Sequence, residues 1–394
     1  PALAADLDIE PAKEYVEVCP NSGFRGAILL PGTGICFKVG GYAKADFIFT
    51  FDDFAGPATA TGVSGGELLF DPNTLGGVGG DRSVFHARQS RINFDARTTT
   101  DLGSARAFIE WDLFNTAGTE TFSNSANPRL RHAFVELGID SLGGSLLAGQ
   151  TWGTFGDLGS YANTLDFNGP NAQTFTRQAQ IRWTQPITES TTIQVAAENP
   201  DFANEGDAGA GFDAVPDFVI ALKNRNAFGN FHLSGVFRYL DPDQGAGAVI
   251  DDEAFGYGVQ FAGTINVGDK DKFRFQVNFG DGIGRYIQQG GAAAIGVGTD
   301  LETLQQFGVI GSYQHFWSDK LQSNLVGGYY SNFDTGLTGV GSVDDQIYAA
   351  VNLIYSPRGN VNLGIEGLYG RNNLVGIADS DDAFRVQTSV QFSF

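Results

Sequence analysis

Hydrophobic and polar residues alternate along several segments of this chain. In residues 272–279, phenylalanine and valine occupy the odd positions, whereas lysine, arginine, glutamine and asparagine occupy the even ones. Residues 383–394 repeat the pattern, interrupted only by Thr388, and stop at Phe394. Alternate side chains of a β-strand point to opposite faces of a sheet. The pattern therefore predicts strands with one apolar face and one polar face.

The alternation recurs often enough to predict an all-β chain. A five-residue turn at 267–271 joins two such segments, as expected of a β-hairpin. We predict sixteen strands, an even number, near residues 36–50, 84–97, 103–114, 129–138, 145–155, 176–185, 191–198, 216–224, 230–240, 254–266, 271–280, 304–315, 320–330, 345–355, 361–370 and 383–394.

The predicted connections alternate in length. Seven short turns, such as 356–360, separate eight longer loops, such as 51–83 and 281–303. Bacterial outer-membrane barrels have short periplasmic turns and long external loops, whereas a soluble β-sandwich has no reason to keep that order. We therefore predict a 16-stranded antiparallel transmembrane β-barrel with its N-terminus and Phe394 on the periplasmic side. A barrel of this size leaves an aqueous channel.

The composition agrees with such a barrel. Charged residues make up 18% of the chain, against roughly 25% in ordinary globular proteins, and phenylalanine occurs 33 times. No run of 18 apolar residues is present, so the sequence predicts no transmembrane helix. The mean hydropathy of −0.11 argues against a helical membrane protein but not against a barrel, because every second strand residue is polar.

The N-terminal region predicts export and a disulfide. Ala2-x-Ala4 is typical of the end of a cleaved secretory signal, and the alternative is an arbitrary boundary of the expressed chain. Cys19 and Cys36 enclose a turn-rich segment, so we predict that they form a disulfide, which would contribute about 3 kcal/mol by loop closure. We divide the chain into a periplasmic N-terminal segment, 1–35, and the transmembrane barrel, 36–394.

The sequence predicts no catalytic site, metal site or cofactor. Its four histidines, His86, His132, His232 and His315, lack metal-ligand spacing and follow no serine-nucleophile motif. A lipolytic barrel enzyme would need a serine and a histidine side by side at one rim, and sequence alone leaves that alternative open. Nucleic acid is not an expected partner, because 24 basic residues face 45 acidic ones in a chain of net charge −21.

Basic residues gather on the polar face of the first, second, third and last predicted strands. Because the last strand must close against the first, these side chains would form one wall of the channel and attract anions. The alternative is that they keep the lumen hydrated and pair with Asp46, Asp95, Glu110 and Asp112. The predicted basic side of the pore constriction consists of Lys44, Arg91, Arg97, Arg106 and Arg385.

Several motifs resemble a known family. The segments 14–19, Glu-Tyr-Val-Glu-Val-Cys, and 30–42, which contains Pro-Gly-Thr-Gly-Ile-Cys before Gly-Gly-Tyr, resemble the opening of alphaproteobacterial porins. Residues 88–95 and 147–152 also resemble strands of these and of dicarboxylate-type porins. The match is strong over roughly the first 50 residues and patchy afterwards.

The resemblance implies an integral, multi-pass channel in the outer membrane of a Gram-negative bacterium. It implies a homotrimer surrounded by lipid and lipopolysaccharide, with Phe394 as the C-terminal signal that the barrel assembly machinery recognises. In such porins the third loop folds inward and narrows the pore. Residues 156–174 are similar to that loop, and Asp157 and Asp166 would then face the basic wall.

We therefore predict a porin for passive diffusion of ions and small hydrophilic solutes. The alternative is a substrate-specific outer-membrane channel for carboxylates or other small anions, built on the same barrel. The acidic exterior and the basic wall predict opposite ion preferences, so the sequence selects neither anions nor cations.

Overall fold

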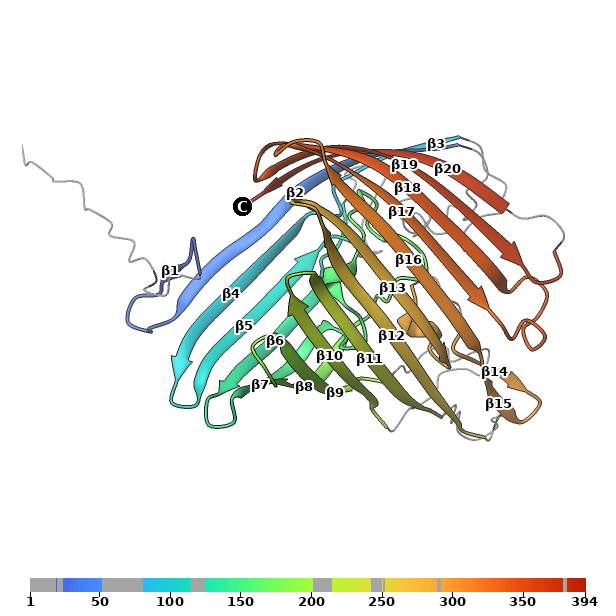
Figure 1. Cartoon of the computed structure of the whole chain (residues 1–394), viewed down its shortest axis with the longest axis horizontal. Coiled ribbons are helices and arrows are strands. Elements are labelled where there is room, and N and C mark those ends of the chain that lie inside the picture. The colour runs from blue at the N-terminus through green and yellow to red at the C-terminus, as the bar shows by residue number, and fades with distance from the viewer. Residues whose placement is uncertain are drawn as a thin grey trace, which may run out of the picture.

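The computed structural model describes residues 19, 24–51, 81–114, 125–200, 215–241, 250, 252–288, 292–377 and 381–394. Within this part of the chain, one sheet contains eighteen strands, and sixteen of them close into an antiparallel barrel (Figure 1). The predicted fold is therefore confirmed. The residues of the predicted signal-cleavage end, Ala2 and Ala4, lie outside the described residues.

The barrel strands agree with the predicted segments to within a few residues, except for the second. They are β2 (Cys36–Phe51), β4 (Arg91–Thr100), β5 (Gly103–Asp112), β6 (Arg129–Ile139), β7 (Gly144–Trp152), β8 (Arg177–Pro186), β9 (Thr191–Glu198), β10 (Asp217–Asn226), β11 (Gly229–Leu240), β12 (Ala254–Val267), β13 (Asp271–Asp281), β16 (Gln305–Phe316), β17 (Leu321–Asn332), β18 (Val343–Arg358), β19 (Val361–Leu374) and β20 (Asp381–Ser393). The remaining elements are β1 (Ile28–Leu29), β3 (Arg82–His86), the hairpin β14 (Ala294–Val297) and β15 (Asp300–Thr303), and the short 3-10 helices η2 (Leu158–Ser160) and η4 (Gly284–Tyr286).

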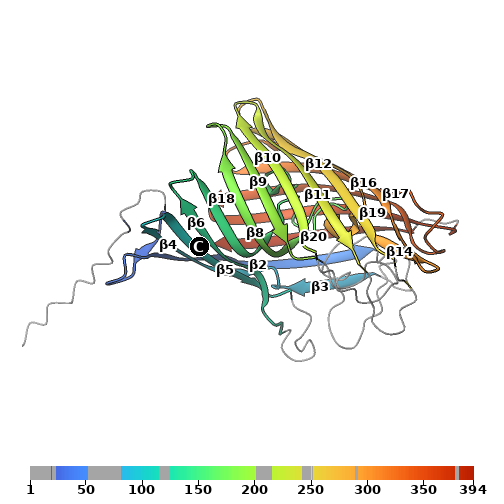
Figure 2. The same ribbon diagram turned by 90° about the horizontal axis from the view of Figure 1, so that it is seen from below.

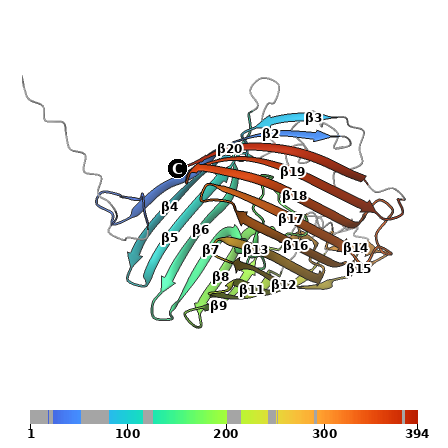
Figure 3. The same cartoon turned by 45° about the horizontal axis from the view of Figure 1, so that its top comes forward.

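The last barrel strand closes against the first. Strand β20 pairs with β2 from Tyr42↔Ser393 to Phe51↔Phe384. Two backbone hydrogen bonds complete the seam, from the Gly41 N–H to the Phe394 carbonyl at 3.2 Å and from the Phe394 N–H to the Gly41 carbonyl at 3.0 Å. The two strands lie side by side in Figures 2 and 3.

The second predicted strand, 84–97, was wrong in one respect, because it is two strands. Both β3 and β4 pair with β2, and residues 87–90 separate them. The Ser90 hydroxyl accepts a hydrogen bond from the Lys44 N–H at 3.0 Å and donates one to the Lys44 carbonyl at 3.2 Å. The hydroxyl thus satisfies the backbone groups that the break would otherwise leave unpaired.

The two faces of the sheet differ as the alternation predicts. On β20, Phe384 and Val390 are more than half exposed on the outside, whereas Gln387 and Ser389 are buried on the lumen side. An apolar outer face suits contact with hydrocarbon, and closure removes the free edges that lipid could not hydrogen-bond. Among the described residues, no helix is long and apolar enough to span a membrane.

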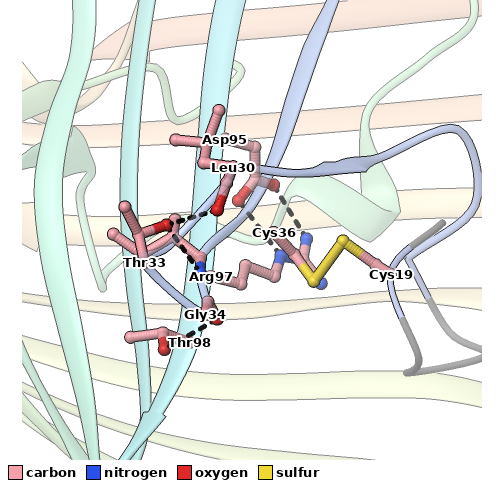
Figure 4. Close-up of a disulfide and its surroundings, with 9 residues drawn as sticks. Cys19, Leu30, Thr33, Gly34, Cys36, Asp95, Arg97 and Thr98 are labelled. Atoms are coloured by element: carbon pink, nitrogen blue, oxygen red, sulfur yellow. Dashed lines mark hydrogen bonds and ion pairs between the residues drawn. A yellow bond between two sulfur atoms is a disulfide. The ribbon is translucent and has the colours of Figure 1, made fainter. Parts of the chain in front are cut away.

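The predicted disulfide joins Cys19 and Cys36 (Figure 4), with 5.7 Å between the two Cα atoms. Because Cys36 is the first residue of β2, the bond ties the N-terminal segment to the barrel. Both sulfur-bearing residues are buried and pack with Ala27. The Arg97 guanidinium lies 4.0 Å from the centre of the Phe24 ring, so the same segment contacts the channel wall near the turn at 101–102.

Candidate functional site

The third long connection, residues 153–176, folds into the lumen and lies on the inner face of the wall. The Ser234 hydroxyl donates a hydrogen bond to the Phe155 carbonyl at 2.7 Å, and the Asn278 side chain donates one to the Ala172 carbonyl at 2.7 Å. These bonds attach the loop to β11 and β13. We refer to residues 153–176 as loop 3, and its inward path confirms the prediction.

Three lumen-facing glycines let the loop backbone lie directly on the wall. A Cβ atom at Gly328 would lie 2.8 Å from the Asn171 carbonyl oxygen, and one at Gly308 would lie 3.1 Å from the Ala172 carbonyl oxygen. At Gly364 it would lie 2.7 Å from the Leu165 side chain. Any larger residue at these positions would push the loop toward the open part of the lumen.

Charged groups hold residues 165–166, which lie mid-way along the sequence of loop 3 and form its end nearest to β2 and β19. The Glu366 carboxylate accepts hydrogen bonds from the Leu165 N–H at 2.9 Å and the Asp166 N–H at 2.8 Å. The Lys44 ammonium donates to the Leu165 carbonyl at 2.7 Å and lies 3.3 Å from Asp46. Charge-assisted hydrogen bonds are the stronger kind, so this end of the loop is fixed to β2 and β19.

Beside these contacts, on strands that follow β2 around the wall, arginines surround one phenylalanine of the loop. The guanidinium carbons of Arg91, Arg129 and Arg131 lie 5.7, 5.5 and 5.6 Å from the centre of the Phe167 ring. The Arg177 guanidinium lies 5.5 Å from the Phe175 ring centre. All are within the range of cation–π attraction. We call Arg91, Arg129, Arg131 and Arg177 the arginine cluster.

Two carboxylates of β5 neutralise part of this cluster. Arg131 lies 2.8 Å from Glu110 and 2.7 Å from Asp112, and Arg129 lies 2.8 Å from Asp112. Within the described part of the chain, Arg177 has no carboxylate partner, and its buried Nη1 has no hydrogen-bond acceptor. The cluster therefore keeps an excess of positive charge.

A cavity of about 300 Å³ lies between two arginines of the cluster and part of loop 3. Arg91 and Arg131 border it on the wall, and Tyr161, Asp166 and Phe167 border it on the loop. The Tyr161 hydroxyl donates a hydrogen bond to the Thr174 carbonyl at 2.5 Å. Burial raises the pKa of this loop phenol, so it stays protonated and keeps that bond.

Comparison with known proteins identifies the chain. A family model described as a porin subfamily matches residues 5–390. The chain belongs to this porin subfamily. The porin is therefore an integral outer-membrane channel for passive diffusion rather than an enzyme. Among curated proteins, none matches this porin significantly in sequence.

Solved structures share the fold of this porin at low sequence identity. The outer membrane channel DcaP of Acinetobacter baumannii superposes with a TM-score of 0.80 at 20% identity, covering 92% of this chain and 98% of that one. An anion-selective porin from Comamonas acidovorans gives a TM-score of 0.57 at 12% identity, with coverages of 91% and 100%. A trimer form of OmpT from Vibrio cholerae gives 0.57 at 11% identity, with coverages of 92% and 100%.

The structure distributes the predicted constriction residues of the porin over four places. Arg91 and Asp166 border the same cavity. Lys44 lies behind the end of loop 3, as does Arg385, whose Nε donates to the Thr50 hydroxyl at 3.0 Å.

Arg97 and Arg106 both bind Asp95, at 2.8 and 2.9 Å, below the arginine cluster and close to the turn at 101–102. Asp157 lies at the opposite side of the lumen, where the carbonyl of nearby Gly159 accepts a hydrogen bond from Thr264 of β12. Neither Asp157 nor this arginine pair borders the 300 Å³ cavity.

Sequence reasoning missed Arg129, Arg131 and Arg177. A signal existed for the first two, since Arg129 and Arg131 share one parity at the start of a predicted strand. Glu110 pairs with His132 and Trp111 with Leu130, so Arg131 is the extra residue of a register shift. This irregularity turns it toward the lumen. The Trp152 ring also packs on loop 3, 4.9 Å from that of Phe175.

Within the described residues, no group of three or more histidines, cysteines, aspartates or glutamates is arranged to hold a metal ion. At the cavity, arginine can supply electrostatic attraction and hydrogen bonding, and Phe167 and Trp152 supply aromatic faces.

Proposed function

We propose that this porin is a general diffusion channel whose narrowest part lies between loop 3 and the arginine cluster, and that this constriction favours anions. The observation that supports the proposal is the arrangement of three guanidiniums around Phe167, with Arg177 beside them and without a carboxylate partner among the described residues. Ions and small hydrophilic solutes would pass along the β4–β8 side of the lumen.

The charges around the cavity support the anion preference. Four guanidiniums of the arginine cluster stand against the carboxylates of Glu110, Asp112 and Asp166, which leaves an excess of one positive charge. A narrow channel with low-dielectric walls concentrates the field of such charges. Acids on the external loops act less strongly on the constriction, because the Debye length is about 8 Å at physiological ionic strength.

Structural neighbours are compatible with this preference. One of them is named an anion-selective porin, and we extend that property to this chain only as a proposal. A substrate-specific channel would need side chains that contact one solute tightly, and no observation favours it. Competition of individual solutes with the chloride current would distinguish the two kinds of channel.

The reversal potential in a KCl gradient across a planar bilayer tests the proposal. We expect the wild type to favour chloride and Arg177→Gln to lower the anion-to-cation permeability ratio by about fivefold. A unit charge about 4 Å from an ion in water is worth about 1 kcal/mol. Arg225→Gln is the matched control, because Arg225 is exposed near the end of β10, where it donates to Asn230. Equal ratios for the two variants would contradict the proposal.

The other predicted basic and acidic residues have supporting roles in this proposal. Lys44 and Arg385 would hold Asp166 and the end of loop 3, and Arg97 and Arg106 would line the periplasmic side of the path. Asp157 would act on the opposite side of the loop. Substituting these residues should change selectivity less than substituting Arg177.

We also propose that the porin is a homotrimer of the alphaproteobacterial type, embedded among lipid and lipopolysaccharide. A neighbour whose name includes a trimer form supports the oligomer, and the N-terminal motifs support the subfamily. Residues 1–35 would form a periplasmic segment closed by the disulfide. Exposed Phe394 at the seam would be recognised by the barrel assembly machinery, and deletion of Phe394 should then reduce the amount of assembled barrel.

A further inference from the structure

We propose that residues 282–288, at the start of the sixth long connection, form a latch that holds loop 3 in place and thereby sets the width of the constriction. This inference rests on the proposed function, since it assumes that the channel is narrowest at loop 3. Tyr286 is the positioning residue of the latch. It does not border the 300 Å³ cavity and acts through the loop.

The latch pairs with loop 3 through the backbone. The Gln288 N–H donates to the Gln173 carbonyl at 2.8 Å, and the Ala172 N–H donates to the Gln288 carbonyl at 3.2 Å. The Phe175 N–H donates to the Tyr286 carbonyl at 3.2 Å, around an antiparallel bridge between Thr174 and Ile287. The two loops thus form a short two-stranded ladder inside the barrel.

An apolar core inside the lumen supports this ladder. Ile283, Tyr286 and Ile287 of the latch pack with Phe155 and Ala172 of loop 3. The wall completes the core with residues that face inward on β9, β10, β11, β16 and β17, namely Ala196, Val219, Val236, Ile310 and Tyr330. Burial of this apolar surface favours the seated position of both loops.

A polar network fixes Tyr286 to the barrel. Its hydroxyl donates to the Asp217 carboxylate at 2.7 Å and accepts from Gln178 at 3.2 Å. Asp217 also binds Arg238 at 3.2 Å, and Arg238 donates to the Gly282 carbonyl at 2.7 Å. The latch is therefore held at both of its ends by β8, β10 and β11.

Backbone geometry indicates that loop 3 is held rather than relaxed. Ala172 has a φ of 67°, the only positive φ of a residue other than glycine in the described chain. Side chains disfavour this region, so it persists only where the surroundings enforce it. Here the Ala172 N–H is bound by the latch and its carbonyl by Asn278.

The held segment reaches the constriction. Gln173 and Phe175 border the 300 Å³ cavity, and the Phe175 ring contacts Arg177 of the arginine cluster. Release of the latch would free residues 172–175, and the aperture between loop 3 and the arginine cluster would then vary with time. The latch thus positions loop 3 at the constriction, although its own side chains do not border the 300 Å³ cavity.

Single-channel recording of the full-length porin tests the latch through Tyr286→Phe. We expect transient conductance changes to become about tenfold more frequent, and the cut-off for sugars in liposome swelling to rise. Tyr313→Phe is the matched control, since its hydroxyl also donates to an aspartate, Asp271, at 2.7 Å but on the outer surface of the barrel. Thermal unfolding of the barrel reports any general loss of stability in either variant.

A cross-link provides a second test that does not depend on a destabilised variant. Because Thr174 and Ile287 face each other in the bridge, Thr174→Cys with Ile287→Cys should allow a disulfide. We expect fewer conductance changes when it is oxidised and wild-type behaviour after reduction. Wild type with and without reductant controls for the native Cys19–Cys36 bond.

The outcomes separate this inference from the proposed function. If wild type conducts and favours chloride, but Tyr286→Phe matches Tyr313→Phe and the cross-link changes nothing, the latch is refuted and the constriction stands. If Arg177→Gln leaves selectivity unchanged while the cross-link alters conductance, the latch stands and the location of the selective constriction is wrong. Absence of any conductance in wild type overturns both.

Discussion

Two halves of the lumen are built from the same alternating strands but differ in what their inward positions carry. Along β9–β17, inward positions include Val219, Val236 and Ile310, which loop 3 and the latch cover. Along β4–β8 they include Glu110 and Asp112, which face the arginine cluster and the cavity. We call these the filled half and the open half.

The difference shows that lumen-facing does not mean water-facing. An apolar side chain is stable inward only if something covers it, and a charged one only if it is paired or hydrated. Loop 3 meets both conditions for the wall residues. One of its faces covers apolar side chains of the filled half, and Phe167 on its other face lies among the guanidiniums of the open half. Asymmetry of the lumen therefore follows from where one loop lies.

The largest expected effect comes from removing the group that holds the end of loop 3. Glu366→Ala leaves the N–H groups of Leu165 and Asp166 without an acceptor, at about 1–3 kcal/mol each. We expect residues 165–166 to detach from β19 and move into the open lumen, so that single-channel conductance falls. Glu302→Ala, on an exposed strand of the hairpin β14–β15, is the control. A conductance equal to that of the control would show that Glu366 does not hold the loop.

A smaller effect is expected from filling the space on which the loop lies. In Gly328→Leu the new side chain meets the Asn171 carbonyl, and overpacking of this kind costs about 1–3 kcal/mol. We expect loop 3 to shift toward the open half and conductance to fall. Neighbouring Gly327 has no atom within 4 Å of its Cβ position, so Gly327→Leu should leave conductance unchanged.

The smallest effect concerns the open half alone. Phe167→Leu removes the ring that three arginines face. A cation–π contact of this kind contributes about 0.5–1 kcal/mol at exposed sites. We expect a modest rise in conductance with chloride preference retained, because the charges stay in place. Reversal potentials and conductance, measured on the same channels, check this prediction. A loss of chloride selectivity would contradict it and would assign the anion preference to the Phe167 ring. Phe333→Leu, at an exposed position, is the control.

Alternation in the sequence predicted the strands, their pairing order and the closure of β20 on β2, because membrane-facing positions are apolar wherever they occur. It could not separate the two halves. On β10 both faces are apolar, with Phe218 and Ile220 outside and Val219 and Ala221 inside, so parity does not show which face a loop covers. Lys44 and Arg91 were both predicted to line the channel wall. Lys44 binds loop 3 whereas Arg91 borders the cavity, and this difference depends on a loop more than 60 residues away in sequence.

The arginine cluster was partly hidden for a local reason. Arg131 turns inward at an irregularity in the β5–β6 register, and strict alternation places it on the other face. Arg177 comes directly after loop 3 and is the first residue of β8, one residue beyond the predicted start of this strand at 176. Pairing of Glu366 with the N–H groups of Leu165 and Asp166 joins residues about 200 positions apart, and no local pattern marks such a contact.

The seam between β2 and β20 has a consequence for the folding kinetics of the chain. A hydrogen bond across it joins Asp46 and Ser389, which are 343 positions apart. Contacts of such long range are reached slowly, since the entropy of closing the intervening chain must be lost before the contact forms. Until β20 arrives, β2 and β19 both keep an unpaired edge, which hydrocarbon does not tolerate. Ring closure is therefore a checkpoint that only a chain carrying its last barrel strand can pass.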